Sequence, residues 1–333
     1  MKTAVIGAGS WGTALAVHLA RIGCQVRLWA REEEVVEGIR SHGVNPLFLS
    51  EVPLPAEVSP TGVLAEALSG AEAIVFAVPV QFARGVLAAM RSHLPSRALL
   101  VSASKGIELG SLERVDQIVR EELAVAEGRF VALSGPSFAH EVAAGLPTAA
   151  VLAGSDGGAV RRLQKRFSSP TFRMYSSNDV VGAELGGALK NVVAIAAGMA
   201  TGLELGRNAL AALLTRGLHE IARLGVRLGG REETFRGLAG MGDLVLTCSP
   251  GSPSRNRTVG ERLGRGERLA EILAGREVAE GVPTTRAAAE LARRHHVEMP
   301  LTFTVEAILD GRLAPRNAVT ALMTRELKDE AVL

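Results

Sequence analysis

Short apolar runs alternate with amphipathic stretches through the first half of the chain. The apolar runs have the length of β-strands, and several are apolar throughout, which is typical of strands buried on both faces of a parallel sheet. We expect strands over residues 3–6, 26–30, 73–78, 98–102, 130–133, 149–153 and 172–175. Helical periodicity fills the intervals between them, over residues 11–22, 32–41, 81–92 and 112–123. This alternation predicts an α/β fold with a doubly wound, mostly parallel sheet.

The pattern changes after about Asn178. Strand signals fade there, and helical periodicity rich in Ala, Leu and Gly covers residues 179–201, 209–228, 285–295 and 302–309. We therefore expect an α/β domain over residues 1–178 and an all-helical domain over residues 179–333. Two domains also suit the length, since a single core rarely grows beyond about 250–300 residues. Two proline-containing segments, 45–60 and 247–256, are expected to be surface loops.

Composition and charge exclude several classes of protein. Apolar residues make up 47% of the chain, which is ample for a core and argues against disorder. The 37 basic and 35 acidic residues leave a net charge of +2, so no general field favours nucleic acid or an anionic membrane. Aromatic residues, at 4%, are too few for the stacking platforms that hold single strands.

Targeting and redox signals indicate a soluble, cytoplasmic protein. The apolar N-terminal segment is interrupted by glycines that would break the helix of a signal peptide. The most apolar later stretch, residues 192–200, is far shorter than a membrane span. Cys24 and Cys248 lie far apart without a metal-binding or redox spacing, so we expect two buried thiols rather than a disulfide. The seven histidines show no ligand spacing either, and we expect no metal site.

A glycine-rich motif follows the first predicted strand and opens the first predicted helix. In a G-x-G-x-x-G pattern the first glycine permits a tight turn, the second lets a pyrophosphate approach the backbone, and the third lets helix and strand pack closely. The start of the helix would offer free N–H groups to the anion. The motif predicts dinucleotide binding, and an ordinary glycine-rich turn is the alternative. Its residues are Gly7, Ala8, Gly9, Ser10, Trp11 and Gly12.

The end of the second predicted strand bears on the choice of dinucleotide. Arg31 stands there, and an arginine suits the 2′-phosphate of NADP. The next residue is Glu32, and an acid at this place accepts hydrogen bonds from the ribose of NAD. We expect NADP or NAD as the cofactor, with NADPH favoured. The alternative is that these charges only begin a solvated helix, whose N-terminus favours acids.

Lysine is scarce, since the chain has 5 Lys and 32 Arg. Lys105 follows the fourth predicted strand, and Lys190 stands among apolar and small residues of a predicted helix. A buried charge is costly unless it is paired, and a lysine kept in an arginine-preferring chain suggests a compact ammonium whose pKa can shift. Such a group can give a proton to a carbonyl oxygen while hydride reaches the carbonyl carbon. The alternative is a lysine that snorkels at a helix surface.

Three further candidates each have a functional and a structural explanation. Asp243, in a glycine-framed turn, could anchor an ammonium or a substrate hydroxyl, or form an Asx turn or a helix cap. Arg255 and Asn256 could grip a phosphate, or begin a surface helix. Ser137, which follows a strand and Gly135, could hold a substrate, or cap a helix.

Seven sequence blocks carry a resemblance to one family. In order along the chain, they are GAGSWGTALA, KGIE, LSGPSFAHEVAAGLPTA, ELGGALKNVVAIAAG, TRGLHEIARLG, GLAGMGDLVLTC and SRNRTVG. They resemble the successive blocks of bacterial NAD(P)-dependent sn-glycerol-3-phosphate dehydrogenases and run over nearly the whole chain. The resemblance implies a Rossmann-type N-terminal domain, an all-helical substrate-binding and catalytic C-terminal domain, and a homodimer. It also implies reversible reduction of dihydroxyacetone phosphate to sn-glycerol 3-phosphate, which supplies glycerophospholipid synthesis.

The resemblance further implies roles for individual residues. Lys190 would exchange the proton, with Asp243 as the second catalytic residue. The residues that would contact the substrate are Lys105, Gly135, Ser137, Lys190, Asp243, Ser254, Arg255 and Asn256. The residues that would contact the cofactor are Gly7, Gly9, Ser10, Trp11, Gly12, Arg31, Lys105, Ala139, Arg255, Val278 and Glu280.

The chain departs from the family pattern at two places, and two other functions are alternatives. Leu210 stands where family members often carry a basic residue, with Arg207 nearby, and the loop before Ser254 is about one residue longer than in some relatives. A β-hydroxyacid or 6-phosphogluconate-type dehydrogenase would share the domain plan but place an Asn one helical turn after the Lys, whereas Asn191 directly follows Lys190. A regulator that senses NAD(P)H without catalysis would need no set of Lys, Asp and Arg.

Overall fold

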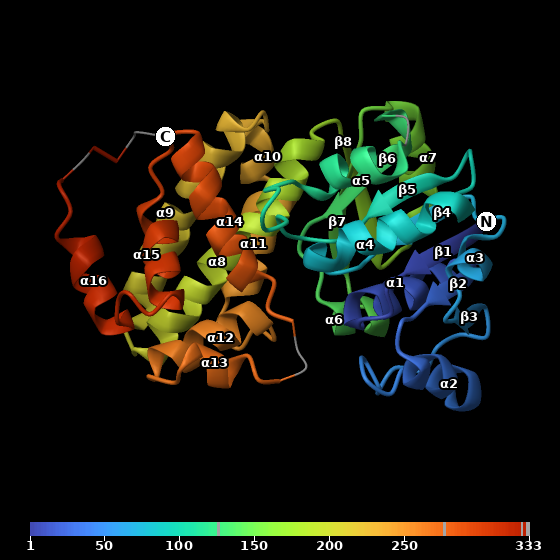
Figure 1. The fold of residues 1–333 in the computed structure, drawn as a ribbon, viewed down its shortest axis with the longest axis horizontal. Coiled ribbons are helices and arrows are strands. Elements are labelled where there is room, and N and C mark those ends of the chain that lie inside the picture. The colour runs from blue at the N-terminus through green and yellow to red at the C-terminus, as the bar shows by residue number, and fades with distance from the viewer. Residues whose placement is uncertain (125–126, 276–277, 328, 331–333) are drawn as a thin grey trace. The chain divides into compact units, whose positions relative to one another are not determined.

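The computed structural model describes residues 1–124, 127–275, 278–327 and 329–330. The chain folds into two compact units, which Figure 1 colours along the sequence. Unit 1 comprises Met1–Ser104 and Val115–Val180, and unit 2 comprises Lys105–Arg114 and Val181–Leu333. The segment Lys105–Arg114, which we expected in the first domain, belongs to unit 2 by its contacts. The division after residue 178 stays a prediction about the limits of the folding domains.

Unit 1 is built on one eight-stranded sheet in the order β3-β2-β1-β4-β5-β6-β7-β8. Every neighbouring pair is parallel except β6 and β7, so the predicted doubly wound, mostly parallel sheet is confirmed. β4 and β6 are buried at every residue, as strands covered on both faces should be. The strands are β1 (Lys2–Ile6), β2 (Gln25–Trp29), β3 (Val58–Thr61), β4 (Ala73–Phe76), β5 (Leu99–Ser102), β6 (Phe130–Ser134), β7 (Thr148–Ala153) and β8 (Phe172–Ser177).

The strand β3 was not expected, although the seven predicted strands are all present. It begins inside the segment 45–60 that the sequence indicates to be a loop, because Pro60 interrupts its pattern. Proline lacks the N–H that a central strand must donate to its neighbour. It is tolerated here because β3 is the edge strand of the sheet and pairs with β2 alone.

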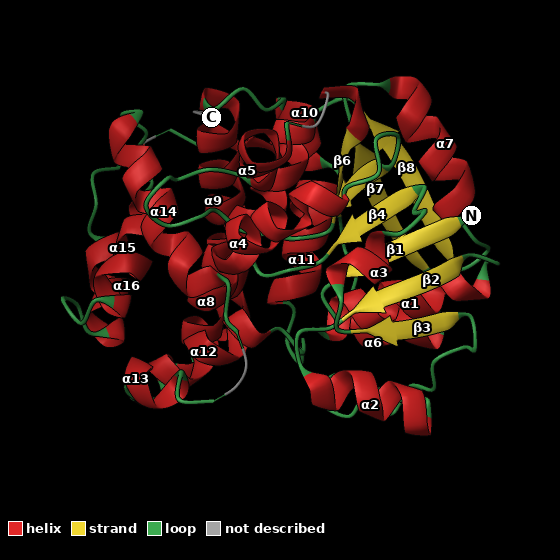
Figure 2. Cartoon of the chain, turned by 45° about the vertical axis from the view of Figure 1, so that its right-hand side comes forward, coloured by secondary structure: helices red, strands yellow, loops and turns green. Residues whose placement is uncertain are grey.

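Helices flank the sheet of unit 1, as Figure 2 shows in red. α1 packs against α6, and α4 packs against α5. The four expected helices correspond to α1, α2, α4 and α5; α3 and α6 span only 5 and 6 residues, which is too short to show a helical period. The helices are α1 (Ser10–Arg21), α2 (Glu33–His42), α3 (Leu64–Leu68), α4 (Val80–Met90), α5 (Val115–Leu123), α6 (Ala139–Ala144) and α7 (Gly157–Phe167), with 3-10 turns η1 (Arg91–His93) and η2 (Glu127–Arg129).

Unit 2 is helical, as its periodicity predicts. The four expected helices correspond to α8, α9, α14 and α15, while shorter helices occupy stretches interrupted by Gly, Ser and Pro. The helices are α8 (Val180–Gly202), α9 (Gly206–Arg227), α10 (Glu232–Arg236), α11 (Asp243–Cys248), α12 (Arg255–Gly264), α13 (Leu269–Ile272), α14 (Gly281–Arg294), α15 (Pro300–Leu309) and α16 (Pro315–Met323), with a π-helical turn η3 (Leu238–Gly242).

The helix α8 lies in the core of unit 2. Its residues from Gly182 to Ala200 are all buried. Among the described residues it is the one helix long and apolar enough to cross a membrane by length and composition, so the expected limit of the apolar stretch to residues 192–200 was too narrow. The share of this span buried inside the protein is 89%, which is typical of the central helix of a core.

Glycines let α8 and α12 approach each other closely. A Cβ on Gly198 of α8 would lie 2.0 Å from the carbonyl oxygen of Arg257, and a Cβ on Gly260 of α12 would lie 1.9 Å from that of Ile195. No side chain fits at either place, so the two backbones meet directly. This contact holds the N-terminus of α12 at a set position along α8.

Both cysteines are free and buried, which confirms the expected pair of thiols. Burial raises the pKa of Cys24, and burial raises the pKa of Cys248 to about 12, so both thiols stay neutral.

Candidate active site

The glycine-rich loop between β1 and α1 has the conformation of a phosphate cradle. Gly7 has a φ of 106°, and a Cβ there would lie 2.8 Å from the carbonyl oxygen of Ala77. A Cβ on Gly12 would lie 1.8 Å from the carbonyl oxygen of Gly7, so the third glycine permits close packing. A Cβ on Gly9 would meet nothing within 4 Å, and α1 begins there without a side-chain cap. The loop therefore leaves room for a pyrophosphate at an uncapped helix N-terminus.

Asn45, which the sequence does not single out, ties this loop to the segment that follows α2. It is 0% exposed, and its amide NH2 donates to the carbonyl oxygen of Ala8 and to the hydroxyl of Thr13, at 2.9 Å each. Its amide oxygen accepts from the backbone N–H groups of Leu47 and Phe48, at 3.2 and 3.1 Å. All four hydrogen-bonding positions of the amide are therefore used. No local pattern marks Asn45, because it lies in an irregular stretch.

Arg31 lies two residues after β2 and is bonded to its neighbour. Its Nε and Nη2 donate to one carboxylate oxygen of Glu32, at 3.1 and 2.7 Å. The side chain of Arg31 is 74% exposed and that of Glu32 is 34% exposed. Arg31 and Glu32, the two residues considered for recognition of the cofactor's ribose or its 2′-phosphate, thus form one solvent-accessible ion pair.

Unit 2 brings both candidate lysines to one carboxylate. Lys105 Nζ donates to Asp243 Oδ2 at 2.6 Å, and Lys190 Nζ donates to Asp243 Oδ1. Asp243 is 1% exposed and Lys190 is 8% exposed, so the alternative of a lysine snorkelling at a surface is wrong for Lys190. Two ammoniums therefore share one buried carboxylate.

Asp243 does not lie in the glycine-framed turn that we expected. It begins α11 and directly follows the π-helical turn η3. A Cβ on Gly240 would lie 2.1 Å from the carbonyl oxygen of Phe235, and a Cβ on Gly186 of α8 would lie 2.5 Å from that of Ala239. These glycines let the turn pack against α10 and α8, which delivers the carboxylate to Lys190.

The pKa of Lys190 suits proton exchange near neutral pH. Burial lowers it from 10.5 to about 8; the charge of Asp243 opposes this shift, and the charge of Lys105 adds to it. An amine with a pKa near 8 holds its proton in part of the molecules and has lost it in the rest. It can therefore act as a general acid in one direction of a reaction and as a general base in the other.

Thr247 completes the surroundings of Lys190, and the sequence analysis missed it. Its hydroxyl accepts from Lys190 Nζ at 2.8 Å and donates to the carbonyl oxygen of Asp243 at 2.6 Å. We expected Thr247 in a loop. Recognition of residues 243–248 as a helix would have placed it one turn after Asp243 and on the same face.

Ser254 and Arg255 lie at the start of α12. The hydroxyl of Ser254 accepts from the N–H of Arg257 at 3.3 Å, so Ser254 caps the helix. Arg255 is exposed, and its Nη1 donates to the carbonyl oxygen of Val278 at 3.4 Å. The structure thus brings together Arg255 and Val278, two residues that the resemblance implies would contact the cofactor.

Asn256 is buried and joins α12 to the start of α14. Its Oδ1 accepts from the N–H of Gly281 at 2.8 Å, and within the described residues its NH2 group makes no hydrogen bond. Glu280, half-buried, stands directly before α14. The amide of Asn256 is therefore oriented by one bond and retains donors for a ligand.

Ser137 does not cap a helix. Its hydroxyl donates to the carbonyl oxygen of Gly135 at 3.0 Å, and α6 begins at Ala139 after Phe138, without a side-chain cap. The structural explanation considered for Ser137 is therefore wrong, and its substrate role stays a prediction.

The expected site residues fall into two groups, one in each unit. Leu210, where a basic side chain is absent, packs against the core of unit 2, and Arg207 is exposed. Within the described residues, no group of three or more His, Cys, Asp or Glu side chains gathers as a ligand set. Unit 1 holds Gly7, Gly9, Ser10, Trp11, Gly12, Arg31, Gly135, Ser137 and Ala139, and unit 2 holds Lys105, Lys190, Asp243, Ser254, Arg255, Asn256, Val278 and Glu280.

Comparison with known proteins gives matches over nearly the whole chain. The family described as NAD-dependent glycerol-3-phosphate dehydrogenase N-terminus matches residues 2–159, and the family described as NAD-dependent glycerol-3-phosphate dehydrogenase C-terminus matches residues 179–320.

Curated relatives and a solved structure agree with these matches. Glycerol-3-phosphate dehydrogenase (NAD(P)+) of Koribacter versatilis is 51% identical over 336 residues, covering 100% of this chain and 99% of the relative. The enzyme of the same description from Geobacter sulfurreducens is 52% identical over 331 residues, covering 99% and 98%. The crystal structure of glycerol-3-phosphate dehydrogenase from Coxiella burnetii superposes with a TM-score of 0.92 at 42% identity, covering 97% of this chain and 99% of that one.

Proposed function

Because the chain belongs to the NAD-dependent glycerol-3-phosphate dehydrogenase family, and so interconverts dihydroxyacetone phosphate and sn-glycerol 3-phosphate with NAD(P), we propose that Lys190 exchanges the proton of this reaction. The observation that carries the proposal is a buried ammonium, with a pKa of about 8, held by Asp243 and Thr247. In a protein that reduces a ketone, such a group has the right protonation to serve the carbonyl oxygen.

The reaction balances with one hydride and one proton. The bound nicotinamide cofactor supplies the hydride in reduction and accepts it in oxidation. In reduction, Lys190 Nζ gives its proton to the carbonyl oxygen while the carbonyl carbon gains the hydride. In oxidation, the neutral amine of Lys190 takes the hydroxyl proton back. Asp243 and Thr247 orient Nζ through the two hydrogen bonds that they accept.

The two ammoniums at Asp243 support a role in binding the anionic substrate. Lys105 donates to the same carboxylate as Lys190, and its side chain is 18% exposed. We assign the substrate phosphate to Arg255 and Asn256, because a planar guanidinium and an amide NH2 both suit phosphate oxygens. Gly135, Ser137 and Ser254 stay in the proposed substrate set.

Steady-state kinetics of Lys190→Ala test the proton role. General acid help is worth about 10²–10⁴-fold, so kcat should fall by that order while cofactor affinity, measured by NADPH fluorescence, stays close to the wild-type value. Lys2→Ala, which removes an exposed ammonium, is the matched control and should keep full activity. A Lys190→Ala variant with the wild-type kcat would remove Lys190 from the mechanism.

The phosphate assignment has a separate test. Arg255→Ala should raise KM for dihydroxyacetone phosphate by roughly 10-fold or more, since a charge-assisted bond contributes about 1.5–3 kcal/mol. Arg265→Ala removes an exposed guanidinium just after α12 and should leave KM unchanged. An unchanged KM in Arg255→Ala would move the anion site elsewhere.

We further propose that NADPH is the favoured cofactor. The support is the exposed guanidinium of Arg31, directly beyond β2, where a 2′-phosphate is recognised in this fold. Arg31→Ala should lower kcat/KM for NADPH more than for NADH, and Glu32→Ala should change the ratio in the opposite direction. An equal loss with both cofactors in Arg31→Ala would contradict the preference.

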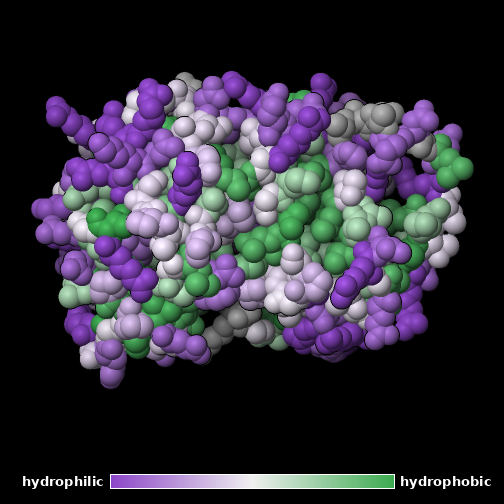
Figure 3. Space-filling view, turned by 180° about the vertical axis from the view of Figure 1, so that it is seen from behind, coloured by the Kyte–Doolittle hydropathy of each residue, from purple (hydrophilic) through white to green (hydrophobic). Residues whose placement is uncertain are grey.

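We propose a cytoplasmic homodimer that supplies glycerol 3-phosphate for phospholipid synthesis. Support for the dimer comes from unit 2, where α9, α15 and α16 line an apolar hollow of about 1310 Å³, near the right-hand edge of Figure 3. Met323 and Leu327 beside it are 79% and 95% exposed, and apolar patches of this kind mark interfaces. Sedimentation should give the mass of two chains, and Met323→Glu should shift the equilibrium towards one. A wild-type monomer at all concentrations would overturn the dimer.

A further inference from the structure

The near balance of charge over the whole chain hides a local imbalance. Residues 157–178 contain five basic residues and no acidic one. Four of the five lie on α7 and the fifth lies on β8, and all are exposed. We name these side chains the cationic face of unit 1; they are Arg161, Arg162, Lys165, Arg166 and Arg173.

The packing of α7 explains why these charges point outwards. α7 buries Ala159, Val160, Leu163 and Phe167 in unit 1, so its opposite side meets solvent. The flanking acid, Asp156, caps the helix by accepting from two backbone N–H groups.

Among the described residues, many arginines elsewhere in the chain form ion pairs, whereas those of the cationic face form none. On α14, Arg286, Arg293 and Arg294 each pair with a carboxylate. Within the described residues, none of the five cations of the cationic face makes an ion pair, and Arg173 instead stacks over the ring of Tyr175. Five cations without an ion pair, beside the single flanking carboxylate of Asp156, create a positive surface potential that the net charge does not reveal.

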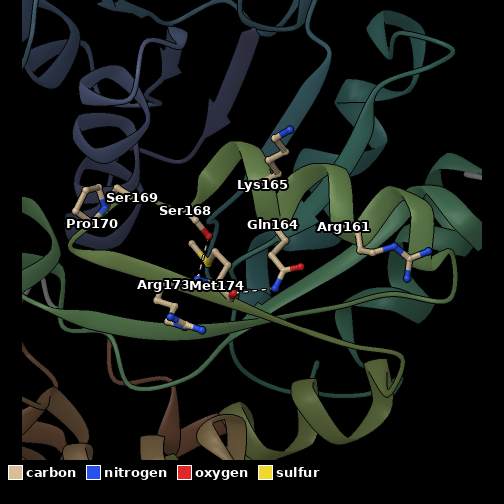
Figure 4. A pocket seen from close by; sticks show the side chains of 8 residues that line it. All are labelled: Arg161, Gln164, Lys165, Ser168, Ser169, Pro170, Arg173 and Met174. Atoms are coloured by element: carbon tan, nitrogen blue, oxygen red, sulfur yellow. Dashed lines mark hydrogen bonds between the residues drawn. The ribbon is translucent and has the colours of Figure 1, made fainter.

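The hollow at the cationic face is not a pocket for a single phosphate. It has a volume of about 550 Å³, and Figure 4 shows the side chains of Arg161, Lys165 and Arg173 pointing away from one another. The amide of Gln164, which lines this hollow, already has a hydrogen-bond partner, because it donates to the carbonyl oxygen of Met174 at 3.0 Å. Cations that diverge fit many separate anions spread over a surface better than one anion at a centre.

We propose that the cationic face of unit 1 docks on the surface of an anionic lipid bilayer. Clusters of 4–8 Lys and Arg on an amphipathic helix are typical of binding to anionic headgroups. The apolar side of α7 is committed to the core, so the contact is electrostatic and involves no insertion. A nucleic-acid strand would instead need cations that converge on one track of phosphates.

Vesicle co-sedimentation of the full chain tests the proposal. The protein should bind vesicles with about one-third phosphatidylglycerol, should not bind pure phosphatidylcholine vesicles, and should be released at about 1 M salt, where the Debye length falls to about 3 Å. The triple variant Arg161→Gln, Lys165→Gln, Arg166→Gln should bind about 100-fold more weakly, because each cation near an anionic surface contributes about fivefold.

A matched variant removes the same charge elsewhere. Arg40→Gln, Arg236→Gln, Arg268→Gln takes three exposed, ion-paired guanidiniums from α2, from α10 and from the residue before α13, and should keep wild-type binding to within about threefold. Both triple variants should keep the dehydrogenase activity measured in solution, which separates this proposal from the assignment of Lys190. Equal weakening in the two triples, absence of binding to anionic vesicles, or tighter binding to a DNA duplex than to vesicles would each overturn it.

Discussion

Asp243→Asn tests the central feature of the site, the carboxylate shared by two ammoniums. The substitution keeps the shape of the side chain but removes its negative charge. Asp243 Oδ1 accepts from Lys190 and Oδ2 accepts from Lys105, so both ammoniums lose their counter-charge at once. The amide NH2 of the new side chain would face at least one of them as a second donor.

The expected shift follows from the charges that stay in place. The pKa of Lys190 is about 8 with Asp243 present, and Asp243 is the group that opposes its fall. An opposite charge at this distance is worth about 1–3 pKa units, so the pKa of Lys190 should fall to roughly 5–7 in the variant. At a pH of about 7.5 the protonated fraction would drop by about 3- to 200-fold, and the reductive kcat/KM should drop at least as much.

The pH profiles in the two directions are the assay. In the wild type, reduction of dihydroxyacetone phosphate needs the protonated amine, so its rate should fall as pH rises above about 8. Oxidation of glycerol 3-phosphate needs the neutral amine and should rise over the same range. In Asp243→Asn both inflections should move to lower pH. Asp116→Asn, a substitution at a buried acid of α5 in unit 1, should move neither. An Asp243→Asn profile with its inflection still near pH 8 would refute the electrostatic argument.

Two further predictions concern stability. Gly260→Ala should cost about 1–3 kcal/mol, because its Cβ would lie 1.9 Å from the carbonyl oxygen of Ile195. Gly85→Ala, at an exposed position of α4 where a Cβ meets nothing within 4 Å, should instead add about 0.5–1 kcal/mol. Calorimetry that gives both variants the same Tm would disprove this. Burial raises the pKa of Glu220 from 4.5 to about 7, so between these pH values the folded state holds a proton that the unfolded state has released. The free energy of unfolding should therefore fall as pH rises from 4.5 to 7, by at most about 3 kcal/mol. Urea titrations at several pH values should show that this pH dependence of the free energy of unfolding is lost in Glu220→Gln and kept in the exposed control Glu204→Gln. If Glu220→Gln keeps the same pH dependence, other groups cause it.

The sheet could be predicted from the sequence because its strands are apolar runs with clear ends. The short helices of unit 2 could not, since α11 and α13 span only 6 and 4 residues and show no period. The glycines before Asp243 favoured a turn in the sequence. Those glycines in fact serve a π-helical turn, where they meet the backbone of a neighbouring segment. Local glycine content cannot distinguish these two uses.

The sequence singled out individual residues of the candidate site and indicated that Asp243 could anchor an ammonium, as it does for Lys190, but the sharing of this carboxylate by two lysines could not be predicted. The low count of lysine singled out Lys105 and Lys190, yet Asp243 is 138 residues away from the first of them. A pairing over that separation depends on tertiary packing, which no local pattern encodes. Asn45 was missed for the same reason, since its bonds to the glycine-rich loop join residues 37 and 32 positions apart.

The choice among glycine, lysine and arginine follows one physical logic in this chain. Glycine stands where two backbones must meet, as at Gly12 in unit 1 and Gly260 in unit 2, and each contact lies on a helix whose start carries residues proposed to bind a ligand. Arginine stands where a charge must persist, because its guanidinium keeps its proton at every physiological pH. At position 190 that permanence would be incompatible with the proposed proton exchange, since a group that never releases its proton cannot exchange one. The same burial that would only destabilise an arginine lowers the pKa of Lys190 to about 8, and so gives the buried ammonium the pKa that its proposed role as acid and base requires.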